Sequence, residues 1–205
     1  MPLRTTVKAS NITNLSDARY CAGMGVEMIG FSMDATSESY VSVQKLNEIR
    51  AWVAGVQIVG QTESADLAEV EALVAAYLPD VLQVSHADIV QRLDKKIPAI
   101  YKVEIDSLPP DDLDDLLRLV QGRVEYILLE SKKSEPLNQA WIDFLGLIAA
   151  EHPILLGFGI NAANVLEMVE KIPLKGIALA GSQELRPGYN DFGALMDILE
   201  MLEED

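Results

Sequence analysis

The first polar residues with catalytic potential come from a short apolar segment near the N-terminus. Thr5–Ala9 carries Lys8 and leads directly into Ser10 and Asn11. In an extended strand, side chains two positions apart point the same way, so Lys8 and Ser10 share one face. A charged lysine on a buried strand needs compensation, and we expect an acid from another strand to pair with Lys8.

A second candidate, Glu130, follows the apolar segment Ile127-Leu128-Leu129. A carboxyl group lifted on the end of a buried strand can have a raised pKa and can act as a general acid. The alternative interpretation is a solvated loop carboxylate that pairs with Lys132 or Lys133.

Glycines follow two of the later apolar segments and indicate a possible phosphate site. Because glycine has no side chain, the backbone amides of Gly157, Gly159 and Gly181 can approach a ligand closely. Asn161 and Ser182 stand next to these glycines. In eight-stranded α/β barrels, loops after the seventh and eighth strands and a nearby helix N-terminus often bind phosphate. Ordinary turns use glycine in the same way, so the pattern leaves both interpretations open.

Two further polar residues belong to the segment that begins at Val81: Gln83 lies within Val81–Val84, and His86 follows it. We assign both to ligand binding because of their place at the end of that segment. The other histidine, His152, stands at the start of a segment and is interpreted as structural. The two histidines are far apart and lack acidic ligands at a suitable spacing, so we expect no metal site.

These candidates are carried by short apolar segments that alternate with longer amphipathic stretches. Continuous apolar segments are typical of strands buried on both faces. Eight strand–helix units favour a closed (β/α)8 TIM barrel of the α/β class, and a doubly wound open sheet is the alternative. No Pro/Gly-rich linker interrupts the chain, so residues 1–205 are predicted to form one domain. The predicted strands are Thr5–Ala9, Met28–Met33, Val56–Val59, Val81–Val84, Pro98–Val103, Val124–Leu129, Ile154–Leu156 and Ile177–Ala180.

Residues that favour helix starts stand between these segments. We expect Ser16, Ser64 and Asn161 to act as N-caps, because their side chains can accept hydrogen bonds from the first turn. The last helix is predicted to run from about Asp191 to Leu202. In such a barrel the active site lies at the carboxyl ends of the strands, where the polar candidates stand.

The composition limits the possible partners. The 205-residue chain has 16 basic and 32 acidic residues, for a net charge of −16. Such a chain repels phosphate backbones and anionic lipid surfaces, so we expect neither nucleic acid nor membrane as a partner. One cysteine, Cys21, excludes a disulfide within the chain. With no signal peptide and no long apolar stretch, we expect a cytoplasmic protein. The oligomeric state is not indicated.

Several motifs along the whole chain resemble the phosphoribosylanthranilate isomerase family. Lys8-Ala9-Ser10-Asn11-Ile12-Thr13 resembles the family's Lys-(Ile/Val)-Cys-Gly-(Ile/Leu)-Thr opening. Leu128-Leu129-Glu130-Ser131 resembles its Leu-Leu-Asp-Ser, and Leu156 to Asn161 resembles its Leu-Ala-Gly-Gly-Leu segment. The resemblance implies a (β/α)8 barrel that binds a phosphorylated aminoaldose and catalyses an Amadori rearrangement without a cofactor.

The departures from the family pattern fall at the positions of the catalytic and ligand-binding residues. The family's catalytic base is a cysteine and its acid an aspartate, and the matching positions are Ser10 and Glu130. An alcohol is less acidic than a thiol and needs a base beside it. The arginine that would bind the anthranilate carboxylate is absent from Ser37-Glu38-Ser39. The glycine-rich loop after the sixth strand is replaced by 133–138, and a strand-eight aspartate by Ala178.

Three functions therefore stay open. In a working isomerase, Glu130 would protonate the ring oxygen, and Ser10, assisted by Lys8 or a carboxylate, would take the C2 proton. A second possibility is a barrel that has lost the reaction and serves as a binding or regulatory protein. A third is an enzyme on a different sugar phosphate, with lysines at 102, 132 and 133 replacing the lost contacts.

Overall fold

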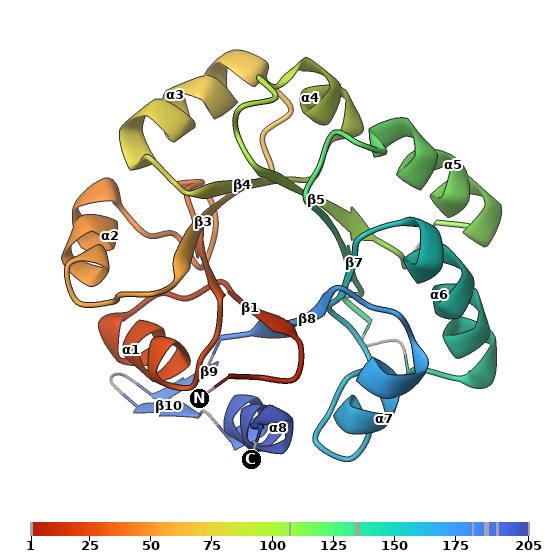
Figure 1. Cartoon of the computed structure of the whole chain (residues 1–205). Coiled ribbons are helices and arrows are strands. Elements are labelled where there is room, and N and C mark those ends of the chain that lie inside the picture. Colours follow the sequence, from red (N-terminus) through yellow and green to blue (C-terminus); the bar gives the residue numbers. More distant parts are fainter. Residues whose placement is uncertain are drawn as a thin grey trace.

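Eight parallel strands close into a barrel in chain order, with β8 paired to β1 (Figure 1). The computed structural model describes residues 2–106, 108–133, 136–181, 183–186, 189–191 and 193–204. The predicted (β/α)8 barrel is confirmed, and the alternative of an open, doubly wound sheet is wrong. The barrel strands are β1 (Thr6–Ser10), β2 (Met28–Ser32), β3 (Gln57–Thr62), β4 (Val81–Val84), β5 (Ala99–Glu104), β6 (Tyr126–Glu130), β7 (Ile154–Leu156) and β8 (Gly176–Ala180).

Helices surround the barrel and cover the outer face of its sheet (Figure 1). Their apolar side chains and the outward-facing strand residues form a large core between the two layers. The helices are α1 (Leu15–Gly23), α2 (Val43–Arg50), α3 (Leu67–Tyr77), α4 (Ala87–Arg92), α5 (Pro110–Val120), α6 (Gln139–Glu151), α7 (Val165–Lys171) and α8 (Gly193–Leu202).

The predicted N-cap residues of α1 and α3 are wrong. The N-cap of α1 is Asn14, not Ser16, and its side-chain oxygen accepts a hydrogen bond from Asp17 N at 2.9 Å. The N-cap of α3 is Asp66, not Ser64. In both loops several cap-forming residues stand close together, so local preference could not choose between them.

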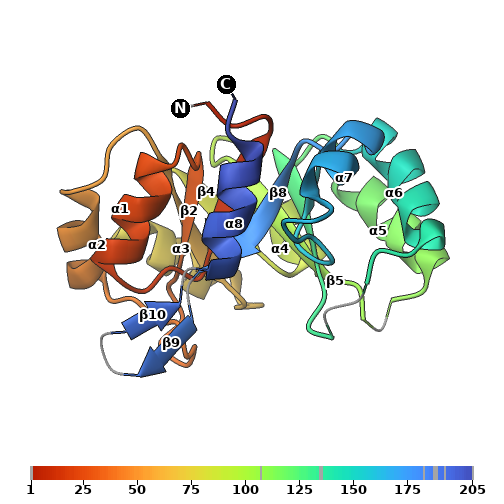
Figure 2. The same ribbon diagram turned by 90° about the horizontal axis from the view of Figure 1, so that it is seen from below.

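A short antiparallel sheet between β8 and α8 was not predicted. It consists of β9 (Gln183–Arg186) and β10 (Tyr189–Asp191). It follows β8 directly and therefore lies at the carboxyl-end face of the barrel. Figure 2 shows it on the side of the molecule opposite the two chain termini.

The interior of the barrel holds a second, smaller core. Its side chains come from the strand positions that point inward, since alternate residues of a barrel strand face inside and outside. Lys8 also lies at an inward position, paired in register with Met28 on one side and Ala178 on the other. The residues of this inner core are Met28, Val59, Val81, Ile100, Leu128, Leu155 and Ala178.

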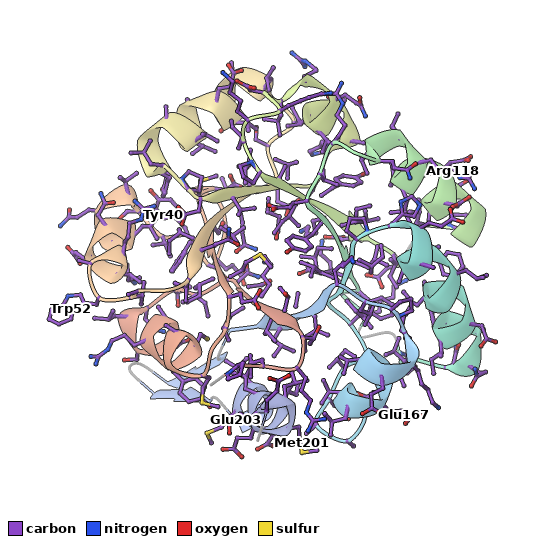
Figure 3. All side chains as sticks on the ribbon, viewed as in Figure 1. Tyr40, Trp52, Arg118, Glu167, Met201 and Glu203 are labelled. Carbon is purple, nitrogen blue, oxygen red and sulfur yellow. The ribbon has the colours of Figure 1, made fainter. Side chains whose placement is uncertain are left out.

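The two tryptophans differ in their surroundings. Trp141 packs edge-on against Phe144 and Phe158, with ring centroids 5.9 and 5.3 Å apart. Trp52 is 68% exposed and points away from the barrel, as does Arg118 (Figure 3). In the part of the chain that is described, none of the helices combines the length and hydropathy needed to cross a bilayer.

Candidate active site

Lys8 and Ser10 form a buried pair inside the mouth of the barrel. The Lys8 Nζ donates a hydrogen bond to Ser10 Oγ at 2.7 Å, and the two side chains are 0% and 3% exposed. The shared direction predicted for these residues is confirmed. The contact places a nitrogen base directly beside the hydroxyl that stands at the family's cysteine position.

The expected ion pair between Lys8 and an acid on another strand is not found among the described residues, whose ion pairs involve other side chains. Burial lowers the pKa of Lys8 to about 8, while attraction to Glu130 opposes this shift and repulsion from Lys102 adds to it. The neighbour at Ala178, paired with Lys8 across the sheet, offers only a methyl group. The result is an amine that can lose its proton near neutral pH.

Glu130 is the last residue of β6 and lines the same mouth. Its side chain is accommodated by Gly157 of the neighbouring chain segment. A Cβ added at Gly157 would lie 3.0 Å from Glu130 Cγ and 2.9 Å from Leu129 O. The glycine therefore provides the space in which the Glu130 side chain packs.

Polar side chains from the ends of several strands enclose a cavity of about 300 Å³, which we call the central pocket. Its walls come from β2 through β6 and from Asn11 after β1. Its ionisable and amide side chains include Glu63, Gln83, Lys102, Glu104 and Glu130.

The lysines of this pocket form ion pairs with carboxylates. Lys102 contacts Glu63 closely and lies 3.8 Å from Glu104. Lys132 lies 2.8 Å from the same Glu104 oxygen, which raises the pKa of Lys132. Burial raises the pKa of Glu63, but the hydrogen bond and the positive charge of Lys102 oppose this shift, and that pKa is lowered overall. These lysines are therefore already engaged by protein carboxylates.

Aspartates after β2 and β5 hold the neighbouring loops in the same way. Asp34 accepts hydrogen bonds from Thr62 Oγ1 at 2.6 Å and Glu63 N at 2.7 Å. Asp106 accepts from Ser131 Oγ at 2.6 Å and Lys132 N at 2.7 Å, and the Ser131 bond lowers its pKa. Each aspartate thus positions the start of the loop that carries a charged wall residue.

Two glutamines lie on the pocket wall and have different partners. Gln61 Oε1 accepts a hydrogen bond from the backbone of Asn11 at 3.1 Å, and this holds Asn11 in a left-handed conformation, φ 57°. Gly30 leaves room for this side chain, since a Cβ there would lie 2.8 Å from Gln61. Gln83 is 3% exposed, and its Oε1 is buried without a hydrogen-bond partner.

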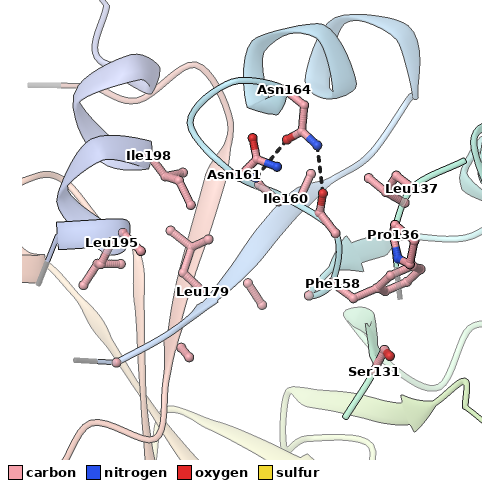
Figure 4. Close-up of a pocket in the computed structure, with 16 residues that line it drawn as sticks. Ser131, Pro136, Leu137, Phe158, Ile160, Asn161, Asn164, Leu179, Leu195 and Ile198 are labelled. Carbon is pink, nitrogen blue, oxygen red and sulfur yellow. Dashed lines mark hydrogen bonds between the residues drawn. The ribbon is translucent and has the colours of Figure 1, made fainter. Parts of the chain in front are cut away.

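A second and larger cavity, of about 740 Å³, lies beside the central pocket, and we call it the side cavity. The loops after β6, β7 and β8 line it together with α8. Figure 4 shows Leu179, Leu195 and Ile198 on one wall and Phe158 on the other. Glycines at positions 157, 159 and 181 supply backbone surface between these apolar groups.

The loop after β7 is held by a pair of asparagines (Figure 4). Asn164 Oδ1 accepts from Asn161 N at 2.8 Å, and its Nδ2 donates to Gly159 O at 2.8 Å. Asn161 was predicted to cap the next helix, but α7 begins at Val165 with Asn164 as its cap residue. Asn161 instead forms a turn, with its side chain accepting from Ala163 N at 2.9 Å.

The remaining predicted site residues are spread around the mouth. Gly181 lines the side cavity, and its N donates to Ser10 O at 2.8 Å. Ser182 lies outside the described residues. His86 does not line either cavity as described, and its Nε2 lies 3.1 Å from Glu63 O.

The site also contains residues that the sequence analysis did not select. Glu63 and Asp106 are the clearest cases, because each organises a charged wall of the central pocket. An acidic residue placed three or four positions beyond a predicted strand end was the only available signal. Within the described residues, no group of three or more His, Cys, Asp or Glu side chains is arranged to hold a metal ion.

These features define a (β/α)8 barrel with a polar site at the carboxyl ends of its strands. A model of the family described as PRAI, N-(5'-phosphoribosyl)anthranilate (PRA) isomerase, matches residues 7–200. The chain therefore belongs to this family.

The alignments with individual relatives cover nearly the whole chain. The N-(5'-phosphoribosyl)anthranilate isomerase of Synechococcus sp. (strain JA-2-3B'a(2-13)) is 28% identical, over 97% of this chain and 91% of that protein. Its namesake from Aquifex aeolicus is 24% identical, over 95% and 96%. The structure of phosphoribosyl anthranilate isomerase from Thermotoga maritima matches with a TM-score of 0.79 and 18% identity, over 97% and 98% of the two chains.

Proposed function

We propose that this protein catalyses an Amadori isomerisation of a phosphorylated, N-substituted aminoaldose, with Ser10 and Lys8 as the base and Glu130 as the acid. The observation that carries the proposal is the buried contact of 2.7 Å between Lys8 Nζ and Ser10 Oγ. A serine alone is a poor base, but a neutral amine within hydrogen-bond distance can accept its proton.

The reaction begins with opening of the sugar ring. Glu130 gives its proton to the ring oxygen, the C1–O bond breaks, and the nitrogen lone pair forms an iminium with C1. Ser10 then takes the proton from C2 while its own proton passes to Lys8. The C2–H electron pair forms the C1–C2 double bond while the iminium electrons return to nitrogen, which gives an enolamine. A proton that Lys8 returns through Ser10, in exchange with solvent, is then added to C1, and the C2 hydroxyl gives its proton to the Glu130 carboxylate, which gives the ketose. The electrons stay within the substrate, so the proposed reaction uses no external oxidant or cofactor.

Binding of the substrate follows from the two cavities. The phosphate would lie in the side cavity, which is lined by Gly157, Gly159 and Gly181 and by the loop after β7. Support comes from a solved phosphoribosyl anthranilate isomerase in complex with reduced 1-(o-carboxyphenylamino)-1-deoxyribulose 5-phosphate, which matches this chain with a TM-score of 0.74. The reacting carbons would then lie between Ser10, at the end of β1, and Glu130, at the end of β6.

The test is formation of the ketose in deuterated water. The substrates are N-(5'-phosphoribosyl)anthranilate and its carboxamide analogue, and mass spectrometry detects solvent deuterium at C1 of the product. We expect deuterated ketose from the unaltered protein and none from Ser10→Ala. If neither substrate is isomerised although one of them binds, the protein is a binding barrel and the proposed function is wrong.

A further inference from the structure

The central pocket has a charge pattern that bears on which substituent the substrate carries. Its described lining contains the carboxylates of Asp34, Glu63, Glu104 and Glu130 but only two lysines. Both lysines contact the pocket's own carboxylates. Lys8 lies deeper in the barrel than this pocket and, when it is protonated, offsets one negative charge of the lining. When Glu130 carries the proton that it donates and Lys8 is neutral, as the proposed reaction requires, three carboxylates face two lysines and the lining remains net negative. A bound anion would find no lysine in the described lining that is not already engaged by a carboxylate.

A second observation at the same place concerns hydrogen bonding. The Gln83 side chain is 3% exposed, lines the pocket, and its Oε1 is buried without a donor. An unsatisfied buried acceptor is costly, and rotation of the Gln83 amide toward the cavity would let a ligand N–H or O–H remove that cost. A carboxylate in the same position would instead place an acceptor against an acceptor.

The location of the substituent follows from the proposed function, on which this inference rests. If the phosphate lies in the side cavity and C2 lies beside Ser10, the nitrogen on C1 points away from the phosphate. That direction leads into the central pocket. Ser37, on the loop after β2, also lines this pocket, in the segment where the family arginine is absent.

We infer that the central pocket accepts an N-substituent that is uncharged or cationic and donates hydrogen bonds, and that it disfavours the carboxylate of anthranilate. Like charges brought together in a partly enclosed site cost binding energy. The Gln83 acceptor adds selectivity for a donor such as a carboxamide N–H. The substrate class is thus an aminoaldose phosphate bearing a carboxamide, hydroxyl or ammonium group at this position.

The experiment compares two non-reactive ligands by isothermal titration calorimetry. One is reduced 1-(o-carboxyphenylamino)-1-deoxyribulose 5-phosphate, and the other is its counterpart with a carboxamide in place of the carboxylate. We expect the carboxamide to bind at least about tenfold more tightly, because like-charge contacts are costly. Equal binding, tighter binding of the carboxylate, or binding of neither compound would overturn the inference.

Variants separate charge from other effects. Glu104→Gln removes one wall carboxylate and releases Lys132, so the preference for the carboxamide should shrink by about threefold or more. Glu48→Gln is the matched control, since Glu48 is exposed on α2 and contacts Gln44. It should leave the ratio unchanged. Preference for the carboxamide without ketose formation would contradict the proposed function and leave this inference standing.

Discussion

The central pocket and the side cavity share one barrel mouth but are built differently. The central pocket is lined by charged and amide side chains at the ends of β2 to β6. The side cavity is lined by glycine backbone and by apolar side chains, among them Leu179, Leu195 and Ile198. A charged wall discriminates between ligands by charge, whereas a backbone wall offers amide dipoles of constant geometry.

The difference indicates how one barrel can keep a cavity wall made of backbone while substitutions of side chains in the other cavity change which ligands it selects. The backbone of the side cavity depends on glycines and on the Asn161–Asn164 turn. The wall of the central pocket depends on individual side chains, any of which a single substitution can change. Glu130 lines the central pocket, and Gly157, which packs against its side chain, lines the side cavity.

The largest expected effect comes from removing the base. Ser10→Ala or Lys8→Met should lower kcat/KM by roughly 10²–10⁴-fold, the usual contribution of general acid–base catalysis. Ser10→Cys should retain activity, because a thiol ionises more readily than an alcohol. In the unaltered protein kcat/KM should rise with pH up to about 8, where Lys8 loses its proton. An unchanged rate constant in Ser10→Ala would rule out the assigned role.

The second effect concerns the pH dependence of stability. Lys8 has a pKa of about 8 when folded and 10.5 as its ordinary value, so the unfolded chain binds more protons between these limits. Stability should therefore rise as the pH increases from about 8 to 10.5, by on the order of 3 kcal/mol from this group. Urea unfolding of Lys8→Met should lack this rise, and the exposed-site control Lys45→Met should keep it.

A third variant disturbs the junction of the two regions. Gly157→Ala places a Cβ against Leu129 O and Glu130 Cγ. Displacement of Glu130 should lower kcat by about 10- to 100-fold, with a stability loss of about 1–3 kcal/mol from overpacking.

Gly146→Ala on α6 is the control for this variant, since a Cβ there meets nothing within 4 Å. It should stabilise the protein by about 0.5–1 kcal/mol, because alanine favours a helix more than glycine does. If Gly157→Ala retains full kcat, Glu130 does not need its present position.

The smallest effect is expected in the side cavity. Asn164→Ala removes hydrogen bonds to Gly159 O and from Asn161 N, each worth about 1 kcal/mol. Loosening of this loop should raise KM several-fold, with little change in kcat, because in the proposed binding mode the loop contacts the phosphate rather than the reacting carbons. Steady-state kinetics measures both constants, and a fall in kcat at constant KM would place the phosphate elsewhere.

Sequence patterns predicted the barrel well because each strand is a continuous apolar run between helices. Strand β4 agrees with its predicted bounds, Val81–Val84, and β7 agrees at Ile154–Leu156. Helix starts were less predictable, since neighbouring Asn, Ser and Asp residues can all serve as caps. The β9–β10 sheet escaped prediction because its strands are too short to give a clear periodicity.

The candidate site was predicted in part. The parity of β1 placed Lys8 and Ser10 on one face, and their hydrogen bond agrees with that. The acid expected to form an ion pair with Lys8 is not found among the described residues. No pattern along the chain shows which side chains meet across a closed barrel. The roles of Glu63 and Asp106 were missed for the same reason.

The amino-acid sequence by itself determined the order of strands and helices, the inward direction of Lys8 and Ser10, and membership in an isomerase-like barrel family. Tertiary structure alone decided which charges meet. Lys102 with Glu63, Lys132 with Glu104, and the unpartnered oxygen of Gln83 all depend on how the ring closes. Periodicity is a local property of the chain, whereas pairing and desolvation depend on distances between residues far apart in the sequence.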